Sequence, residues 1–412
     1  MTHIYAHRPF TYRAANTLGA IVQRFGIEPN FEIGQLLEKA KSAVKLDDFG
    51  DDHFITPLER LLHAYEHEAH LNTIGKVSAH TYLLQLLTNR LRLEEDRKTN
   101  LVIAQQEIKK PIFILGLPRS GTTFLHALLA EDPSTRTPIT WEVMYPSPPP
   151  KKQSFDNDER IRRTARNLRW LERLAPKFNS IHAVKGHLAQ ECIAITTHAF
   201  ASIQFHTTHN VPSYQSWLEQ SDMSYAYKYH KRFLQHLQAY NSADRWLLKA
   251  PGHMFDIESL LREYPDARII QTHRDPLEVV ASISSHANVI RAAFSDVLYP
   301  KEIAQDWQQY WWRALQRTMD YRRHNPTQAV HDIYYTDLVA DPIAVVKKIY
   351  TELDMVVSDE FERAMRKYIQ ANAQAKHRYT LQEFGFEPKR IRELFSEYYQ
   401  AYQFDDGLEQ TL

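Results

Sequence analysis

The sequence predicts an α/β fold: a parallel sheet that helices flank in a three-layer α/β/α arrangement, joined to a helical N-terminal extension. Two observations carry this prediction. Four short apolar runs of strand length are each followed by a helical stretch, which is the pattern of βαβ units. Residues 1–105 instead show apolar side chains at three- and four-residue spacing, which is typical of amphipathic helices.

The expected strands are short and mostly apolar, as in a sheet covered on both faces: Pro111–Leu117, Trp246–Lys249, Ala267–Thr272 and Ala329–Tyr335. Helices are expected at about 253–264, 276–288, 337–353 and, rich in aromatic residues, at Glu302–Arg323. An insertion at about 150–242 begins with the stiff segment PSPPPKK and is expected to be mainly helical. The 412 residues exceed the size of about 250–300 residues at which one core stops growing, so we expect a helical extension at 1–105 and an α/β domain at 106–412.

Composition excludes several classes of protein. Hydrophobic residues make up 43% and charged residues 24%, which is typical of a globular chain rather than a disordered one. Lys+Arg and Asp+Glu both total 50, so the net charge gives no reason to expect a nucleic-acid partner. Cys192 is the only cysteine, which rules out an intrachain disulfide and a thiolate zinc cluster. Neither a signal peptide nor a transmembrane segment is evident, and we expect a cytoplasmic protein.

The segment after the first strand, GLPRSGTT at 116–123, has the pattern of a phosphate-binding loop. A strand, a glycine-spaced turn and a helix start bring several backbone N–H groups to one anion. The spacing Gly116-x4-Gly121 is that of P-loop NTPases, and the expected fold is similar to theirs. The lysine that follows the second glycine in those enzymes is Thr122 here, and Arg119 supplies a cation instead. This difference argues against hydrolysis of ATP or GTP.

A second segment, THRDPLEVVASISS, predicts another anion site. Arg274 stands at the end of a strand, Asp275 is a plausible N-cap, and Pro276 suits the first helical position. Ser282 follows about two turns later. An arginine and a hydroxyl near a helix start can bind phosphate through charge-assisted hydrogen bonds. Two anion sites far apart in sequence fit a bis-phosphorylated nucleotide better than a nucleoside triphosphate.

The segment PRSGTTF resembles the 5′-phosphosulfate loop of sulfotransferases that use 3′-phosphoadenosine 5′-phosphosulfate (PAPS). The resemblance implies that PAPS is the cosubstrate and 3′-phosphoadenosine 5′-phosphate (PAP) its product. It assigns the 5′-phosphosulfate to Arg119, Ser120, Gly121, Thr122 and Thr123, the 3′-phosphate to Arg274 and Ser282, and the adenine to Tyr335. Tyr335 resembles the tyrosine of the family's YED segment, although Thr336 replaces the usual glutamate. HRYTLQEFGF at 377–386 resembles the C-terminal stretch of bacterial-type members of this family, which closes over the cofactor.

Two residues are candidates for the base that accepts the proton of the acceptor. Glu142, expected at the end of a short strand, matches the catalytic glutamate of glycan- and tyrosylprotein-type sulfotransferases. His253 lies in a segment similar to the lysine–histidine segment of cytosolic sulfotransferases, and its ordinary pKa suits a base at neutral pH. Lys249 in the same segment is a candidate for stabilising the bridging oxygen. No carboxylate pair flanks the loop, so no metal site is predicted.

The sequence thus predicts a PAPS-dependent sulfotransferase that moves a sulfuryl group in line to a hydroxyl or amine of a small-molecule, lipid or glycan acceptor. Two alternatives stay open. One is a P-loop nucleotide kinase or NTPase, which would depend on Mg²⁺. The other is a protein that binds sulfonucleotides without turnover. The sequence specifies neither the acceptor nor the oligomeric state, for which a homo-oligomer is one candidate.

Overall fold

The computed structural model describes residues 10–23, 29–174, 186–372 and 386–404. The chain divides into two compact units. The helical unit comprises residues 1–107, 138–242 and 287–298, and the sheet unit comprises residues 108–137, 243–286 and 299–412. The first break between the units, at 107/108, lies near the predicted boundary at 105/106, but the helical unit also takes in the insertion. Most of the segment 377–386, expected to cover a cofactor, lies outside the described residues.

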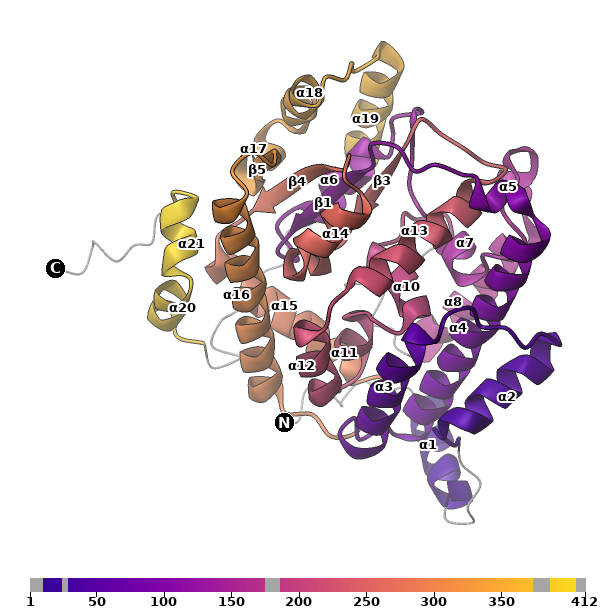
Figure 1. Cartoon of the computed structure of the whole chain (residues 1–412). Coiled ribbons are helices and arrows are strands. Elements are labelled where there is room, and N and C mark those ends of the chain that lie inside the picture. The colour runs from indigo at the N-terminus through magenta and orange to yellow at the C-terminus, as the bar shows by residue number, and fades with distance from the viewer. Residues whose placement is uncertain (1–9, 24–28, 175–185, 373–385, 405–412) are drawn as a thin grey trace. The chain divides into compact units, whose positions relative to one another are not determined.

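The sheet unit contains a five-stranded parallel sheet in the order β2-β3-β1-β4-β5 (Figure 1). The strands are β1 (Ile112–Gly116), β2 (Thr135–Arg136), β3 (Arg245–Lys249), β4 (Arg268–His273) and β5 (Val330–Tyr334). The predicted parallel α/β fold is therefore confirmed. The last strand ends one residue earlier than predicted, and Tyr335 is the first residue of a helix rather than the last of a strand.

Helices pack on both faces of the sheet at the central strand β1, because successive side chains of the strand point to opposite faces. Ile112 and Ile114 belong to an apolar cluster with residues of α6, α17, α18 and α19. Phe113 points to the other face, where its ring contacts His253 and Tyr264. The helices of this unit are α6 (Thr122–Leu129), α14 (Ile257–Glu263), α15 (Pro276–Arg291, up to residue 286), α16 (Pro300–His324), α17 (Tyr335–Ala340), α18 (Pro342–Glu352), α19 (Asp359–Ala371), α20 (Pro388–Leu394), α21 (Ser396–Ala401) and the 3₁₀ turn η4 (Pro251–Phe255).

One predicted helix is in fact two. The stretch expected at 337–353 breaks between α17 and α18 at Asp341–Pro342. Proline cannot donate a helical hydrogen bond, and the Asp341 carboxylate accepts the N–H of Ala344 at 2.9 Å, so a new helix begins there. The break leaves α17 as a short helix that starts directly at the carboxyl end of β5.

The helical unit consists of helices around the long α4 (Figure 1). They are α1 (Phe10–Gln23), α2 (Ile33–Val44), α3 (Ile55–His67), α4 (Thr73–Thr99), α5 (Leu101–Ala104), α7 (Thr140–Met144), α8 (Glu159–Leu174), α10 (Cys192–Thr196), α11 (Gln204–Thr208), α12 (Pro212–Gln220) and α13 (Ser224–Gln238), with 3₁₀ turns η1 (Asp52–Phe54), η2 (Lys152–Asn157) and η3 (Thr197–Ala199). Among the described residues, no helix is both long enough and apolar enough to cross a bilayer.

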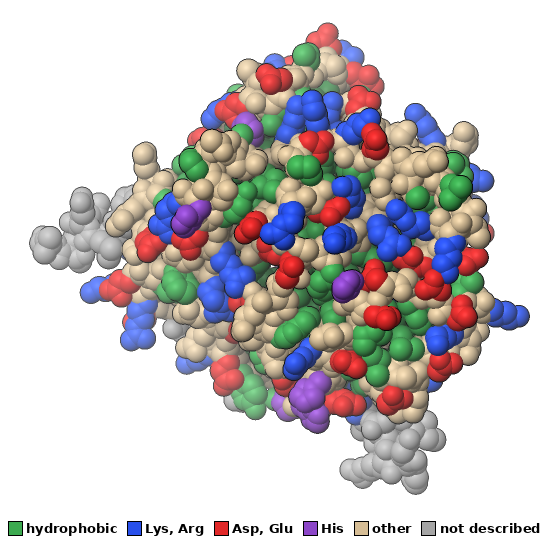
Figure 2. Space-filling view, in the orientation of Figure 1, with side chains coloured by type: hydrophobic (Ala, Val, Ile, Leu, Met, Phe, Trp, Pro, Cys, Tyr) green, Lys and Arg blue, Asp and Glu red, His purple; other side chains and the backbone are tan. Residues whose placement is uncertain are grey.

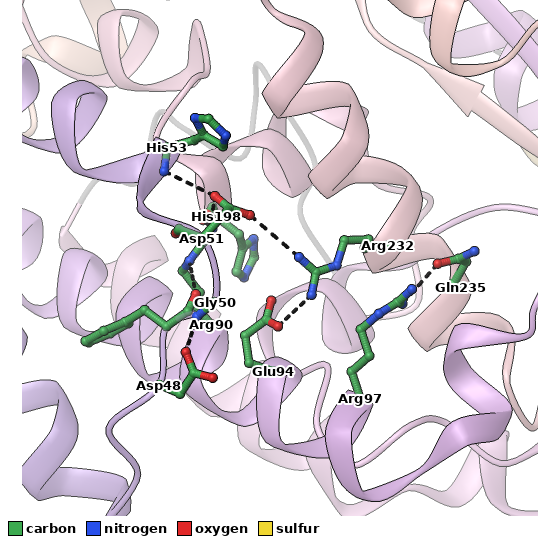
Figure 3. A network of polar contacts seen from close by, with 11 residues as sticks. Asp48, Gly50, Asp51, His53, Arg90, Glu94, Arg97, His198, Arg232 and Gln235 are labelled. Carbon is green, nitrogen blue, oxygen red and sulfur yellow. Dashed lines mark hydrogen bonds and ion pairs between the residues drawn. The ribbon is translucent and has the colours of Figure 1, made fainter.

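A polar network in the helical unit holds the loop between α2 and α3 against α4 and α13 (Figure 3). Arg90 of α4 is 1% exposed and donates from Nη2 to the carbonyl and carboxylate of Asp51 at 3.1 and 3.2 Å. Glu94, one turn later, accepts from Arg232 of α13. Gly50 has φ +81°, and a Cβ there would lie 2.7 Å from Cδ of Glu94, so the loop requires glycine at this position.

On the face of the molecule shown in Figure 2, Lys and Arg side chains are interspersed with Asp and Glu. This mixture is expected from equal numbers of the two kinds of charge, 50 and 50.

Candidate active site

The predicted phosphate loop connects β1 to α6 through three residues with positive φ. Gly116 has φ +139°, Arg119 +69° and Gly121 +92°. A Cβ at Gly116 would lie 2.5 Å from the carbonyl oxygen of Thr272, and one at Gly121 would lie 3.0 Å from Cδ2 of Tyr335. The two glycines therefore allow the close approach of β4 and α17, as well as the backbone turn.

The turn leaves the start of α6 with N–H groups directed out of the helix. In the described part of the chain, the first N–H of α6 with an acceptor is that of Leu125, which donates to the carbonyl of Gly121 at 2.9 Å. The N–H groups of Thr122, Thr123 and Phe124 precede it and donate to no group within the described parts of the chain. Three converging donors at the positive end of a helix are suited to bind an anion.

Ser120 fixes this loop to the neighbouring strand. Its side chain is buried, and its Oγ donates to the carbonyl of Leu117 at 2.6 Å and lies 2.5 Å from Oγ1 of Thr272. The hydroxyl is therefore engaged within the protein, where it joins the loop to β4.

Lys249 lies beside the loop, at the carboxyl end of β3. Its Nζ donates to Oγ1 of Thr123 at 3.3 Å. The connection from β1 leads through α6 to β2, on the far side of β3, whereas the connection from β3 leads to β4 on the opposite side of β1. In open α/β sheets, ligands bind at the carboxyl ends of the strands where the direction of the connections reverses in this way. The loop and Lys249 stand at this point.

Arg274, the residue after β4, contacts the loop directly. Its Nη1 donates to the carbonyl of Arg119 at 2.8 Å, and its Nε donates to Oε2 of Glu278 at 2.9 Å. Its Nη2 lies 2.8 Å from the same oxygen of Glu278 and forms an ion pair with it. A guanidinium carries five N–H groups. Two are hydrogen-bonded and a third faces the Glu278 carboxylate, so two remain for an anion. None of the described residues accepts from these two.

Tyr335 completes the group. The guanidinium of Arg274 lies 4.0 Å from the centre of its ring, and Gly121 borders the same ring. Ser282 lies about two turns into α15 and is 5% exposed. The structure thus brings together the loop, Lys249, Arg274 and Tyr335, which are up to 216 residues apart in sequence (119 to 335).

Comparison with known proteins decides the family. The model of the sulfotransferase family matches residues 111–359, more than half of the chain. The chain belongs to the sulfotransferase family. This sulfotransferase is 30% identical to sulfotransferase STF1 of Mycobacterium tuberculosis H37Rv, whose crystal structure superposes with a TM-score of 0.80 over 89% of this chain and 98% of that one.

Two further relatives are similar over most of their length. The crystal structure of STF9 from Mycobacterium avium, 24% identical, superposes with a TM-score of 0.80 over 90% of this sulfotransferase and 97% of that chain, which supports the fold. Omega-hydroxy-beta-dihydromenaquinone-9 sulfotransferase Stf3 of Mycobacterium bovis is 25% identical over 286 residues, 65% of this chain and 68% of its own.

Glu142, the first candidate base, does not lie at the end of a strand; that expectation was wrong. It lies in the first turn of α7, is fully buried, and accepts the N–H of Ile139 at its Oε1 at 3.0 Å. A carboxylate that accepts a backbone N–H just before a helix stabilises the helix start. Glu142 belongs to the helical unit, whereas the loop belongs to the sheet unit. Its catalytic role stays a prediction.

His253, the second candidate base, belongs to the sheet unit and lies in η4. It is 3% exposed, and its ring meets that of Phe113 edge-on, with centroids 5.2 Å apart and planes at 88°. Phe113 is the second residue of the central strand, so the His253 ring is part of the packing on that face of the sheet.

Sequence reasoning missed a polar cluster directly behind Arg274. His273, fully buried at the end of β4, contacts Oδ1 of Asp332 with Nε2 at 2.8 Å. Arg322 of α16 binds both oxygens of the same carboxylate at 2.6 and 2.7 Å. Burial opposes ionisation of Asp332, but the hydrogen bonds from Arg322 and His273 outweigh it and hold its pKa well below the ordinary value. In the sequence, the one sign of this cluster was that His273 directly precedes Arg274.

Proposed function

We propose that this sulfotransferase moves the sulfo group of PAPS to a hydroxyl, or an amine, of its acceptor. One observation carries the proposal: Arg274 joins the phosphate loop to the ring of Tyr335 while two of its N–H groups remain for an anion. A helix start with three N–H donors and an arginine with two make two separate anion sites beside one aromatic ring. A nucleotide with phosphates on both its 5′ and 3′ positions has matching groups.

The residues would divide the nucleotide as follows. The N–H groups at the start of α6, with Arg119, Gly121, Thr122 and Thr123, hold the 5′-phosphosulfate, and Ser120 keeps the loop in shape. Arg274 and Ser282 hold the 3′-phosphate, and the ring of Tyr335 lies against the adenine. When bound, PAPS supplies an activated sulfo group. Lys249 then stabilises the negative charge on the oxygen that the sulfo group leaves.

The acceptor must lose a proton as its oxygen forms the new bond to sulfur. We propose Glu142 as the base that accepts this proton, with His253 as the second candidate. The packing of the His253 ring on Phe113 favours a structural role for the histidine. A carboxylate has about four acceptor positions, so the hydrogen bond from Ile139 to Glu142 is compatible with a further role as a base.

The acceptor proposed here is a hydroxyl on an apolar small molecule or lipid. One relative, Stf3, is a sulfotransferase of omega-hydroxy-beta-dihydromenaquinone-9, a hydroxylated lipid. A cytoplasmic location and a homo-oligomeric state stay predictions.

Binding of nucleotides to the purified protein tests the two anion sites. We expect PAP to raise the melting temperature more than AMP or ATP does at the same concentration. A ligand at a hundredfold excess over its dissociation constant stabilises the folded state by about 2.7 kcal/mol. Equal shifts for PAP and AMP would remove the 3′-phosphate site, and a larger shift for ATP with Mg²⁺ would favour the kinase or NTPase alternative.

A further inference from the structure

The C-terminal helix α21 is fastened to the strand end that carries Arg274. Two consecutive tyrosines of α21 contact the residues on either side of the arginine. The hydroxyl of Tyr398 lies 2.9 Å from Nδ1 of His273, and the hydroxyl of Tyr399 donates to Oδ1 of Asp275. Both tyrosines are 1% exposed. All of these residues belong to the sheet unit.

The contact on one side of Arg274 is anchored in a buried cluster. His273 is held between Tyr398 and the carboxylate of Asp332. The ring of Tyr402, the residue after α21, stacks on His273 with centroids 3.9 Å apart, and its hydroxyl accepts from Arg322 at 3.0 Å. Burial lowers the pKa of His273 and so keeps the ring neutral, as a ring with one donor and one acceptor nitrogen requires.

The contact on the other side controls the start of α15. Oδ1 of Asp275 accepts the N–H of Leu277 at 2.8 Å, which caps the helix, and the same oxygen accepts the hydroxyl of Tyr399. Burial, and then the hydrogen bond to Asp275, raise the pKa of Tyr399 far above its ordinary value, so the hydroxyl stays a donor. The first turn of α15 carries Glu278, which binds Arg274, and the next turns carry Ser282.

We propose that Tyr399 is a positioning residue for the 3′-phosphate half of the nucleotide site. The inference rests on the proposed function. Arg274 takes its direction from Glu278 and from the carbonyl of Arg119, so its free N–H groups are aimed correctly only if the strand end and the first turn of α15 keep their places. Tyr399 fixes both through the single oxygen of Asp275. Among the described residues, the hydrogen bond of its hydroxyl goes to Asp275 and not to the phosphate loop.

The test compares dissociation constants of PAP and AMP, by calorimetry, for the wild type and Tyr399→Phe. The variant keeps the ring, which packs on Phe404, and loses only the hydroxyl. We expect the preference for PAP over AMP to fall about fivefold or more, which is about 1 kcal/mol, with AMP affinity within about twofold of the wild type. In steady-state assays KM for PAPS should rise more than kcat falls.

Tyr350→Phe is the matched control. Tyr350 is also buried in the sheet unit, and its hydroxyl donates to the carboxylate of Asp132 at 2.6 Å, away from Arg274. We expect its preference for PAP to equal that of the wild type. If Tyr399→Phe does not fold, Asp275→Asn replaces it, because asparagine retains the helix cap while weakening the acceptor for Tyr399.

The outcomes separate this inference from the proposed function. A wild type without preference for PAP would refute the 3′-phosphate site and the inference with it. If the wild type prefers PAP and Tyr399→Phe or Asp275→Asn shows the same preference, the positioning role of Tyr399 is overturned and the 3′-phosphate site is retained. Equal weakening of PAP and AMP, or the same loss of preference in Tyr350→Phe, would also overturn it by showing a general effect on the fold.

Discussion

Replacing Arg274 with alanine should weaken the binding of PAP without unfolding the chain. Two N–H groups of the guanidinium have no acceptor among the described residues, and we propose that they bind the 3′-phosphate. Hydrogen bonds to charged groups contribute about 1.5–3 kcal/mol, so the dissociation constant should rise about 10- to 150-fold. The contacts that Arg274 makes within the protein go to the exposed Arg119 and Glu278 and to one face of Tyr335, so the loss of folding stability should be about 1 kcal/mol.

Calorimetric titration with PAP and with AMP measures this effect, because AMP lacks the 3′-phosphate that we propose Arg274 binds. We expect Arg274→Ala to bring the two dissociation constants close together. Arg274→Lys should recover only part of the loss. A lysine cannot donate to the carbonyl of Arg119, to Glu278 and to a phosphate in the fixed geometry of a guanidinium. An unchanged affinity for PAP in Arg274→Ala would refute the assignment of the 3′-phosphate site.

Three other predictions concern the base, the charge beside the site and acid stability. Glu142→Gln should keep PAP affinity and lose about 10²–10⁴-fold in kcat, whereas the same loss in His253→Ala alone would move the role of base to the histidine. Glu278→Gln should tighten PAP binding up to about fivefold, since its carboxylate lies 2.8 Å from Arg274 and repels a phosphate there; weaker binding would contradict this. Burial lowers the pKa of four histidines of the helical unit to about 3 or 4: His198, His209, His230 and His236. Above about pH 6.5 these histidines are neutral in both the folded and the unfolded chain, and the folded state has its full stability. As the pH falls to 5, protonation of each histidine in the unfolded chain lowers the free energy of unfolding by up to about 2 kcal/mol. An equal melting temperature at pH 7 and pH 5 would refute this.

The sequence was informative where local chemistry determines structure. The run PIFILGLPRSGTT specified β1, the loop and the start of α6, because buried strands must be apolar and the turn requires glycine at 116 and 121. Arg274 was found for the same reason, since Asp275 and Pro276 are recognisable as a helix start.

Other features depended on contacts that no local pattern reveals. Strand β2, Thr135–Arg136, has only two residues at the edge of the sheet and was not expected. PITWEVMYP is a short apolar run between prolines, and periodicity does not distinguish strand from helix in such a run, so Glu142 was placed wrongly. The contact of Tyr399 with Asp275 joins residues 124 positions apart, and only the folded chain shows it.

The claim that this sulfotransferase takes its sulfo group from PAPS is tested most directly by incubating the purified protein with radiolabelled PAPS and a panel of hydroxylated lipids, phenols, steroids, glycans and peptides. We predict that the label appears on an acceptor hydroxyl in amounts equal to the PAP released, with no need for added Mg²⁺. Hydrolysis of ATP or GTP with Mg²⁺, together with no transfer from PAPS to any acceptor of the panel and no preferential binding of PAP, would contradict the claim.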